Sequence, residues 1–518
     1  MARAGARAKS LNSTVTLPPA LVRRPGFGLS AVLVLALATV VSAFAATMHP
    51  KLVLYGGGAV CAGVLAWCVW RAPHVAAAAL LVFVELQAAL KFYLSSAFGP
   101  AKDAATILVV VVVVAPVLFS RAGRARVPDR WLLAALVALL TVYVLDPAGG
   151  HAAGWLPAVR LVGESFGLFA VGWLARDPAR SWRWLARALV GCGMVQSAFG
   201  IVQQLLGADR LVTQLGLAYG SQVRTTTSGQ LRSLGTFDDP FNYGAITTLA
   251  LVVAAVTIRR AWLRYATVAL LAVGVVVSVD RTMIVLLPVF VLLWLAVRGR
   301  AALAALLIAG GIAAGALVLS LPSAPPPPQV VLADTAPGNF LLTLNGRTET
   351  WSQVIRGPAD VLFGRGVGVL GSGLARSQQQ GISEQARYVD GVAPPPATND
   401  DLTSLDNSYV ALVADVGLLG LALLVLFGAR VWAGLAAGLH TRTRPALAGG
   451  AVLVVTLVDG LTRTSLTAFP FGFVALLVLG AALAAVHAGP PAPSVPTLSA
   501  PTRTEGEVRS MHHEAVAH

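Results

Sequence analysis

Apolar residues occur along the chain in blocks of about twenty, separated by short polar segments, and about twenty apolar residues in a helix cross ~30 Å of hydrocarbon. The strict alternation of apolar and polar residues that is typical of membrane β-barrels is absent. The pattern predicts an all-α polytopic membrane protein with about fourteen transmembrane helices. The expected spans are 27–47, 52–70, 75–94, 104–120, 131–145, 157–175, 184–206, 243–258, 265–279, 282–297, 301–321, 408–437, 445–463 and 469–487. The span 408–437 is long for one perpendicular helix, so we expect it to be tilted or to continue past Arg430.

Two long polar segments interrupt the apolar pattern and define the expected organisation. The later one opens with four consecutive prolines, which form a stiff spacer. The C-terminal tail is rich in Pro, Ser and Thr, a composition typical of disorder. The expected parts are a basic cytoplasmic N-terminus (1–26), transmembrane helices (27–321) with an external loop (207–242), a large extracytoplasmic loop (322–405), C-terminal transmembrane helices (406–487) and a cytoplasmic tail (488–518).

Composition supports the membrane class and narrows the meaning of the net charge. Hydrophobic residues make up 56% of the chain and charged residues 12%, with a mean hydropathy of +0.75. Soluble proteins average about 25% charged residues, so a soluble globular enzyme and a disordered scaffold are excluded. The net charge of +15 is mostly explained by Arg in loops that the span count places in the cytoplasm. We therefore expect no nucleic-acid partner.

Some charges are not explained by this topology, and each is a candidate site because ionisable groups at membrane depth are costly. Arg160 and Glu164 are four residues apart on one expected helix. They could neutralise each other, or Arg160 could face an external cavity. Asp280 and Arg281 form a tight external turn, so Arg281 needs either Asp280 or an anionic substrate group as its partner. Arg463 is a further external candidate.

The segment from Arg232 to Gly244 reads R-S-L-G-T-F-D-D-P-F-N-Y-G and precedes an expected span. Its Asp-Asp-Pro element suits the start of a helix. One interpretation is an ordinary capped loop. The other places Arg232 and Asn242 at the rim of an external cavity.

The large loop carries further candidates. Arg347 and Trp351 are four residues apart, so a short helix would present the guanidinium to phosphate oxygens with the indole packed beneath it. The G-x-G-x-G of 364–368 lacks the Lys of a phosphate-binding loop, and we expect it to be a flexible turn near the site. Asp406, just before an expected helix, suits an N-cap, and a carboxylate near several Arg could also act as a general base.

In their order and placement, these motifs resemble the O-antigen ligase and polysaccharide polymerase superfamily of membrane glycosyltransferases, the Wzy/WaaL type. The resemblance covers about 230–425 and extends to most of the chain through its many helices and single large late loop. The matching elements are R-x-x-G-T-F-x-D-P-x-N (232–242), D-R-T (280–282), G-R-x-x-x-W (346–351), L-F-G-x-G-x-G (362–368), D-N-S-Y (406–409) and G-L-L-G (417–420).

The resemblance implies transfer of a glycan from an undecaprenyl-diphosphate carrier to an acceptor hydroxyl, at the outer face of a bacterial plasma membrane. It also implies a GT-C-like helical architecture, an inverting reaction, and no metal, nucleotide or other cofactor. In the family, Arg residues hold the donor diphosphate and a His near the end of the large loop is the proposed base. In this sequence Asp406 stands where that His is expected.

The resulting assignment makes Asp406 the base and Arg232, Arg281 and Arg347 the diphosphate clamp. Supporting positions are Arg160, Asn242, Trp351, Asn407 and Arg463. Expected partners are the lipid-linked oligosaccharide, a glycan, lipid or protein acceptor, membrane lipids and other polysaccharide-assembly proteins. A polymerase is favoured. A ligase with a lipid or protein acceptor is the nearest alternative, and a lipid-linked glycan flippase or transporter is the alternative of another class.

Overall fold

The computed structural model describes residues 63–94, 98–124, 127–149, 154–217, 222–226, 230–298, 357–369, 407–467 and 469–489. Apart from 63–65, these residues belong to one compact unit, Ala66–His518. The described residues are mostly helical, which confirms the all-α class. After a helical stretch at 63–71, the elements are α3 (Pro73–Tyr93), α4 (Phe98–Phe119), α5 (Arg121–Arg124), α6 (Arg130–Leu145), α7 (Trp155–Trp173), α8 (Pro178–Thr213), β1 (Arg224–Thr225), β2 (Leu231–Arg232), α9 (Pro240–Thr257), α10 (Ala261–Ser278), α11 (Arg281–Arg298), α15 (Pro358–Phe363), α17 (Ser408–His440), α18 (Arg444–Thr462) and α19 (Phe471–His487).

Seven of these helices are long and apolar enough to cross a membrane, namely α3, α4, α8, α9, α10, α17 and α18. Shorter apolar helices lie at Arg130–Leu145, Arg281–Phe290 and Phe471–His487. The protein is therefore a multi-pass membrane protein by helix length and composition. The expected spans 27–47 and 301–321 lie outside the described residues, as do most of 52–70 and of the large loop. The total of fourteen spans and the GT-C-like architecture stay predictions.

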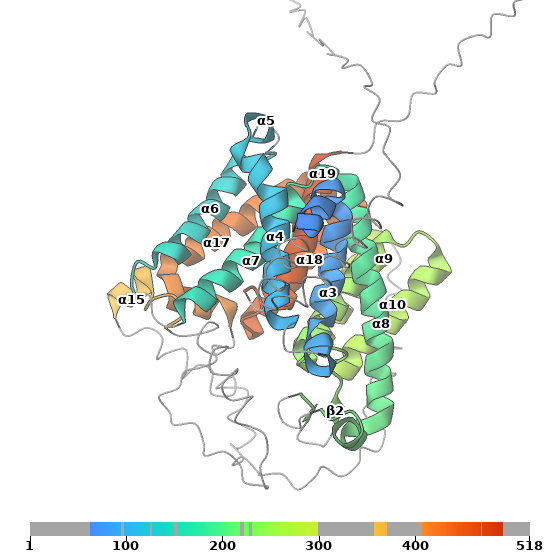
Figure 1. Ribbon diagram of the computed structural model, residues 1–518. Coiled ribbons are helices and arrows are strands. Elements are labelled where there is room, and N and C mark those ends of the chain that lie inside the picture. Colours follow the sequence, from blue (N-terminus) through green and yellow to red (C-terminus); the bar gives the residue numbers. More distant parts are fainter. Residues whose placement is uncertain are drawn as a thin grey trace, which may run out of the picture. The chain divides into compact units, whose positions relative to one another are not determined.

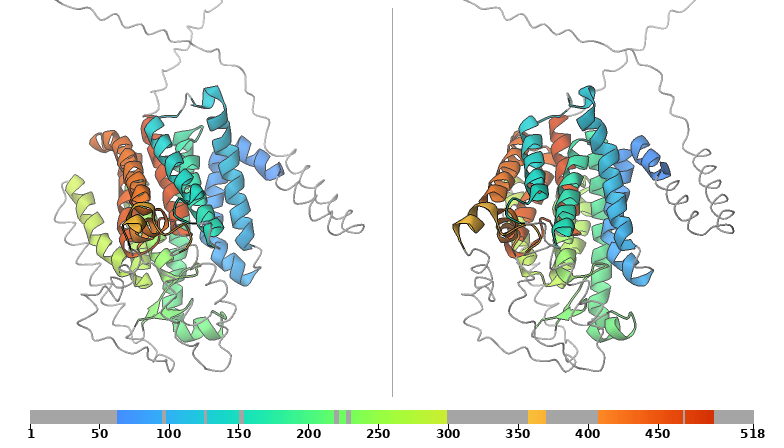
Figure 2. Two further views of the ribbon diagram at one scale, coloured as in Figure 1. Left: turned by 90° about the vertical axis from the view of Figure 1, so that its left-hand side faces the viewer. Right: turned by 60° about the vertical axis from the view of Figure 1, so that its left-hand side comes forward.

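Within this unit the helices run alongside one another around α19 (Figure 1, Figure 2). Every residue of α19 from Phe471 to Ala484 is buried, as expected for a helix that is apolar on all sides. It packs most extensively against α7, where Gly172 and Gly480 bring the two backbones together. A Cβ on Gly480 would lie 2.2 Å from the Phe169 carbonyl oxygen, so only glycine fits there.

Glycines break two of the long helices. Gly207 (φ 78°) divides α8, so the external segment expected from 207 begins with further helix up to Thr213. Gly417 (φ 65°) divides α17, and a Cβ there would lie 2.2 Å from the carbonyl oxygen of Leu362 in α15. The helix of the expected long span 408–437 continues past Arg430 to His440, as one of the two expectations has it, but it consists of two segments joined at a break.

The Gly-rich turn after α15 is anchored, which corrects the expectation of a flexible turn. The Val367 N–H donates to Asp146 Oδ1 (2.7 Å) and the Gly368 N–H to Asp415 Oδ1 (3.2 Å). The Arg365 N–H donates to the carbonyl oxygen of Ala414, just before the break in α17 (2.7 Å). Buried carboxylates that accept backbone N–H groups fix a loop strongly.

Three contacts involve loops or helix ends, which the span count assigns to two sets. In the set expected in the cytoplasm, Arg430 Nη2 pairs with Asp129 Oδ2 (2.7 Å), and the Arg176 guanidinium lies 4.0 Å from the Trp70 ring centroid. In the other set, the Lys102 ammonium lies 4.5 Å from the Phe469 ring centroid. In Figure 1, α5 and β2 mark opposite ends of the unit. Which end faces the cytoplasm stays a prediction.

Candidate functional site

Two arginines lie opposite each other in a hairpin of two-residue strands at one end of the bundle. Strands β1 and β2 pair antiparallel, with Arg224 directly opposite Arg232. Like charges in this position repel each other. Burial, and then the neighbouring Arg281 and Arg224, lower the pKa of the half-buried Arg232. Its Nε has no hydrogen-bond partner, and it forms no ion pair with any described residue. Positive charge is therefore held here at a cost that an anionic ligand would remove.

Two glutamines of α8 hold the chain that follows β2. Gln203 Oε1 accepts from the N–H groups of Leu234 (3.1 Å) and Gly235 (2.9 Å), and its Nε2 donates to the Gly235 carbonyl oxygen (2.8 Å). Gln196 Oε1 accepts from the Thr236 N–H (2.8 Å). The two glutamines are seven residues apart and so share one helix face. They fix the backbone of the hairpin segment from within the bundle.

The start of α9 comes next, and it confirms the expected helix start. Asp239 Oδ1 accepts from the N–H groups of Phe241 and Asn242, both at 2.8 Å, and Pro240 occupies the first helical position. The Asn242 side-chain amide donates to Asp239 Oδ2, and Asn242 is buried. Asn242 thus supports the helix cap at the site. This contact supports the interpretation as a capped loop.

The Phe241 ring lies among three guanidinium groups. The guanidinium carbons of Arg232, Arg463 and Arg224 are 5.5, 5.8 and 5.9 Å from its centroid. These arginines come from β2, from the segment after α18 and from β1. We define Arg224, Arg232, Arg281 and Arg463, together with Phe241, as the arginine cluster.

Arg463 joins this cluster to the start of α17. Its Nε and Nη2 bind the fully buried carboxylate of Asp459 at 2.7–3.0 Å. The Ser408 Oγ donates to the Arg463 carbonyl oxygen (2.7 Å), and Asn407 Nδ2 donates to the Leu461 carbonyl oxygen (2.9 Å). The start of α17 and the segment that carries Arg463, far apart in the sequence, are therefore brought together.

The tight turn between α10 and α11 supplies Asp280 and Arg281, as expected. Asp280 Oδ1 caps α11 by accepting two backbone N–H groups at 3.1 and 3.4 Å. Its Oδ2 has no hydrogen-bond partner among the described residues, and the residue is only 3% exposed. Burial raises the pKa of Asp280 to about 6, an effect that nearby Arg463 partly offsets. Arg281 is exposed and close enough to lower the pKa of Arg232.

A second group of charges, which we define as the paired cluster, consists of Lys102, Asp103, Arg160 and Glu164. Lys102 Nζ binds Asp103 and Glu164 (3.1 Å to the latter), and Arg160 binds Asp103 (2.9 Å) and approaches Glu164 (3.9 Å). The expected pair of Arg160 and Glu164 is thus part of a network of two cations and two carboxylates. The ion pairs that Arg160 forms with described residues lie within the paired cluster.

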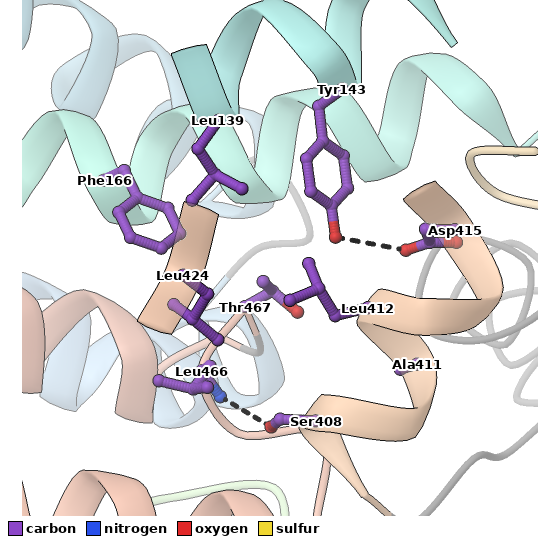
Figure 3. Close-up of a pocket in the computed structure, with 10 residues that line it drawn as sticks. All are labelled: Leu139, Tyr143, Phe166, Ser408, Ala411, Leu412, Asp415, Leu424, Leu466 and Thr467. Atoms are coloured by element: carbon purple, nitrogen blue, oxygen red, sulfur yellow. Dashed lines mark hydrogen bonds between the residues drawn. The ribbon is translucent and has the colours of Figure 1, made fainter. Parts of the chain in front are cut away.

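A small pocket adjoins the start of α17 (Figure 3). It encloses about 340 Å³ including its open mouth, and its walls are mostly apolar. At one end the Tyr143 hydroxyl donates to Asp415 Oδ2 (3.4 Å), and at the other Ser408 Oγ accepts from the Leu466 N–H (3.1 Å). Ser408 also donates to the carbonyl oxygen of Arg463, so this residue links the pocket to the arginine cluster.

Three assigned residues, Arg347, Trp351 and Asp406, lie outside the described residues. One detail at the last position is corrected. The N-cap of α17 is Asn407, whose Oδ1 accepts from the N–H groups of the second and third residues that follow it (2.9 and 3.0 Å). The cap expected at Asp406 therefore belongs to its neighbour, because the helix begins at Ser408.

Sequence reasoning missed four residues of this site, namely Arg224, Phe241, Gln196 and Gln203. Gln196 and Gln203 carried a usable signal, since two amides on one face of an apolar helix need partners inside the bundle. Arg224 and Phe241 carried none, because their role depends on the pairing of β1 with β2 and on the end of α18.

Comparison with known proteins adds no family to this picture. No protein-family model matches the chain, and no curated protein matches it. Within the described ranges, no three His, Cys, Asp or Glu side chains come together as ligands for a metal ion. The features that point to a function are therefore the arginine cluster and the sequence motifs.

Proposed function

We propose that this protein is a membrane glycosyltransferase whose donor is a glycan linked through a diphosphate to a polyprenyl lipid. The observation that carries the proposal is Arg232, which is half-buried, lies opposite Arg224 and forms no ion pair with a described residue. A diphosphate offers several oxygens to planar guanidinium forks, and guanidinium groups bind such oxygens bidentately. Arg281 and Arg463 stand beside this pair and enlarge the anion site.

The proposed reaction is a direct displacement at the extracytoplasmic face. The acceptor hydroxyl oxygen attacks the anomeric carbon, and the bond to the diphosphate breaks with its electron pair leaving on the phosphate oxygen. The arginines stabilise this growing negative charge, and a base takes the hydroxyl proton. Asp406 is the proposed base, and Arg347 with Trp351 completes the clamp. These last three roles rest on the sequence motifs alone.

Transfer is tested with the lipid-linked glycan that accumulates in a strain lacking the gene. The purified protein in phospholipid vesicles is given this donor, and mass spectrometry looks for a new glycosidic bond and free polyprenyl diphosphate. We expect product with the unaltered protein and a loss of about 100-fold or more with Arg232→Ala or Arg281→Ala. Arg430→Ala is the matched control, because Arg430 pairs with Asp129 near the other end of α17.

The vesicle assay and glycan analysis in the deletion strain together separate the competing activities. Movement of the donor across the vesicle membrane without a new bond would identify a flippase and overturn the proposal. Short repeats in the deletion strain would identify a polymerase, which we favour, whereas full-length glycan left on its carrier would identify a ligase. Equal activity of Arg232→Ala and Arg430→Ala would remove the arginine cluster from the site.

A further inference from the structure

A single aromatic ring stands where three guanidinium groups converge. The Phe241 centroid is 5.5 Å from the guanidinium carbon of Arg232, 5.8 Å from that of Arg463 and 5.9 Å from that of Arg224. The three arginines belong to three separate segments of the chain. No other aromatic ring in the described part of the chain has three cations recorded within this range.

The three guanidinium groups repel one another, so an interaction that attracts each of them would stabilise their arrangement. Arg224 and Arg232 are opposed across the hairpin, where like charges repel. Arg463 is bound to Asp459 on one side, which leaves the face of its guanidinium for the ring. The face of an aromatic ring attracts a cation without neutralising it. The ring can therefore hold Arg232 beside the other two guanidinium groups without using the N–H donors with which Arg232 would bind phosphate oxygens.

The backbone fixes the ring itself. Phe241 follows Pro240, whose ring sets the first helical φ, and its N–H donates to Asp239 Oδ1 (2.8 Å). The helix that begins here is buried along almost its whole length, from Pro240 to Ala254. A ring on the first turn of an immobile helix is a rigid platform, and rigid positioning lowers the entropy lost when a ligand binds.

We infer that Phe241 is a positioning residue that holds Arg224, Arg232 and Arg463 in the arrangement that binds a diphosphate. This inference rests on the proposed function and adds a residue to it. Loss of the ring weakens donor binding while leaving every arginine present. A hydroxyl added to the ring edge, as in Phe241→Tyr, keeps the face that the cations use.

The test measures binding of farnesyl diphosphate, a prenyl diphosphate without sugar, to the full chain in detergent by calorimetry. We expect Phe241→Leu to weaken binding about tenfold, and Phe241→Tyr to stay within about twofold of the unaltered protein. We also expect Phe241→Leu to show a shallower loss of affinity with salt, because fewer guanidinium groups engage the ligand at once. In the transfer assay, Phe241→Leu should raise the KM for the donor more than it lowers kcat.

Phe83→Leu is the matched control, since Phe83 is also half-buried but its recorded ring partner is Phe98 and not a cation. Equal binding by Phe241→Leu and Phe83→Leu would overturn the inference and leave the proposed function intact. Equal weakening by the Leu and Tyr variants would also overturn it, because the ring face would then be irrelevant. If the unaltered protein does not bind farnesyl diphosphate, the proposed clamp fails together with the inference. Should Phe241→Leu not fold, Phe241→Met replaces it in the same comparison.

Discussion

The arginine cluster and the paired cluster contain the same kinds of side chain but differ in how their charges are satisfied. In the paired cluster, Lys102, Asp103, Arg160 and Glu164 each have an ion-pair partner within the group. In the arginine cluster, Arg232 has none among the described residues and keeps a buried Nε without a hydrogen bond. Ion pairs of this kind stabilise the fold. A charge such as that of Arg232, which has no ion pair among the described residues, is a candidate for binding a ligand.

The two clusters are also mechanically connected. The segment between α18 and α19 carries Arg463 at its start and Phe469 near its end. Arg463 lies in the arginine cluster, while the Phe469 ring is 4.5 Å from the Lys102 ammonium. The paired cluster therefore contacts one end of the segment that carries Arg463 at its other end. In this way it can support the arginine cluster.

The largest expected effect is on stability, from breaking the paired cluster with Lys102→Met. The side chains of Lys102 and Glu164 are 5% and 3% exposed, so the change removes the nearest cation from the buried carboxylate of Glu164 and leaves it only the more distant Arg160. We expect the free energy of unfolding to fall by about 3–5 kcal/mol. Chemical unfolding in detergent measures this, with Lys102→Met/Glu164→Gln expected to recover part of the loss. A stable Lys102→Met that no longer binds farnesyl diphosphate would instead make the paired cluster a binding site.

Arg232→Ala should give the opposite profile. We expect transfer to fall by about 100- to 1000-fold, because a preorganised donor to the developing charge is removed. Stability should hold or rise, since the repulsion across the hairpin from Arg224 is relieved. Activity and thermal unfolding are measured on the same preparation. Arg232→Lys should recover only part of the activity because it lacks the planar fork. A large loss of stability in Arg232→Ala would erase the contrast between the clusters.

Gln203→Leu tests how the backbone beside the arginine cluster is fixed. The amide of Gln203 makes three hydrogen bonds to the backbone that follows β2, and Gln203 is 1% exposed. We expect a loss of about 1–3 kcal/mol in the free energy of unfolding, with weaker binding of farnesyl diphosphate. Gln204→Leu is the control, since its Oε1 accepts a single hydroxyl at 3.1 Å. Equal effects of the two variants would show that Gln203 does not position the cluster.

The smallest expected effect depends on pH. Asp280 has a pKa raised to about 6, so its negative charge among the arginines is lost as pH falls below 6. Farnesyl diphosphate affinity should therefore rise about threefold between pH 7.5 and pH 5 beyond the change seen with Asp280→Asn, which removes titration but keeps the cap. The folded pKa lies above the ordinary value of 3.8 for an Asp carboxyl, so the contribution of Asp280 to stability is full below pH 3.8 and is lost as pH rises through 6. Identical pH profiles for the two proteins would contradict this prediction.

Much of the candidate site could be chosen from the sequence because misplaced charge is visible without a structure. Arg232, Arg281 and Arg463 were selected as external residues, and the fold brings them together. Arg160 was selected by the same criterion and proved to belong to the paired cluster. The sequence shows that a charge is unusual, but whether it has a partner depends on residues that are distant along the chain.

Apolar block length alone determined that this is a multi-helix membrane protein, because a bilayer of fixed thickness demands helices of fixed length. Asp239 and Pro240 similarly marked the start of α9 through local chemistry. Only the tertiary structure decided that Arg224 faces Arg232 and that Phe241 lies among three guanidinium groups. The physical reason is range: helix length and capping are set within a few residues, whereas charge pairing and ring stacking are set by which segments meet.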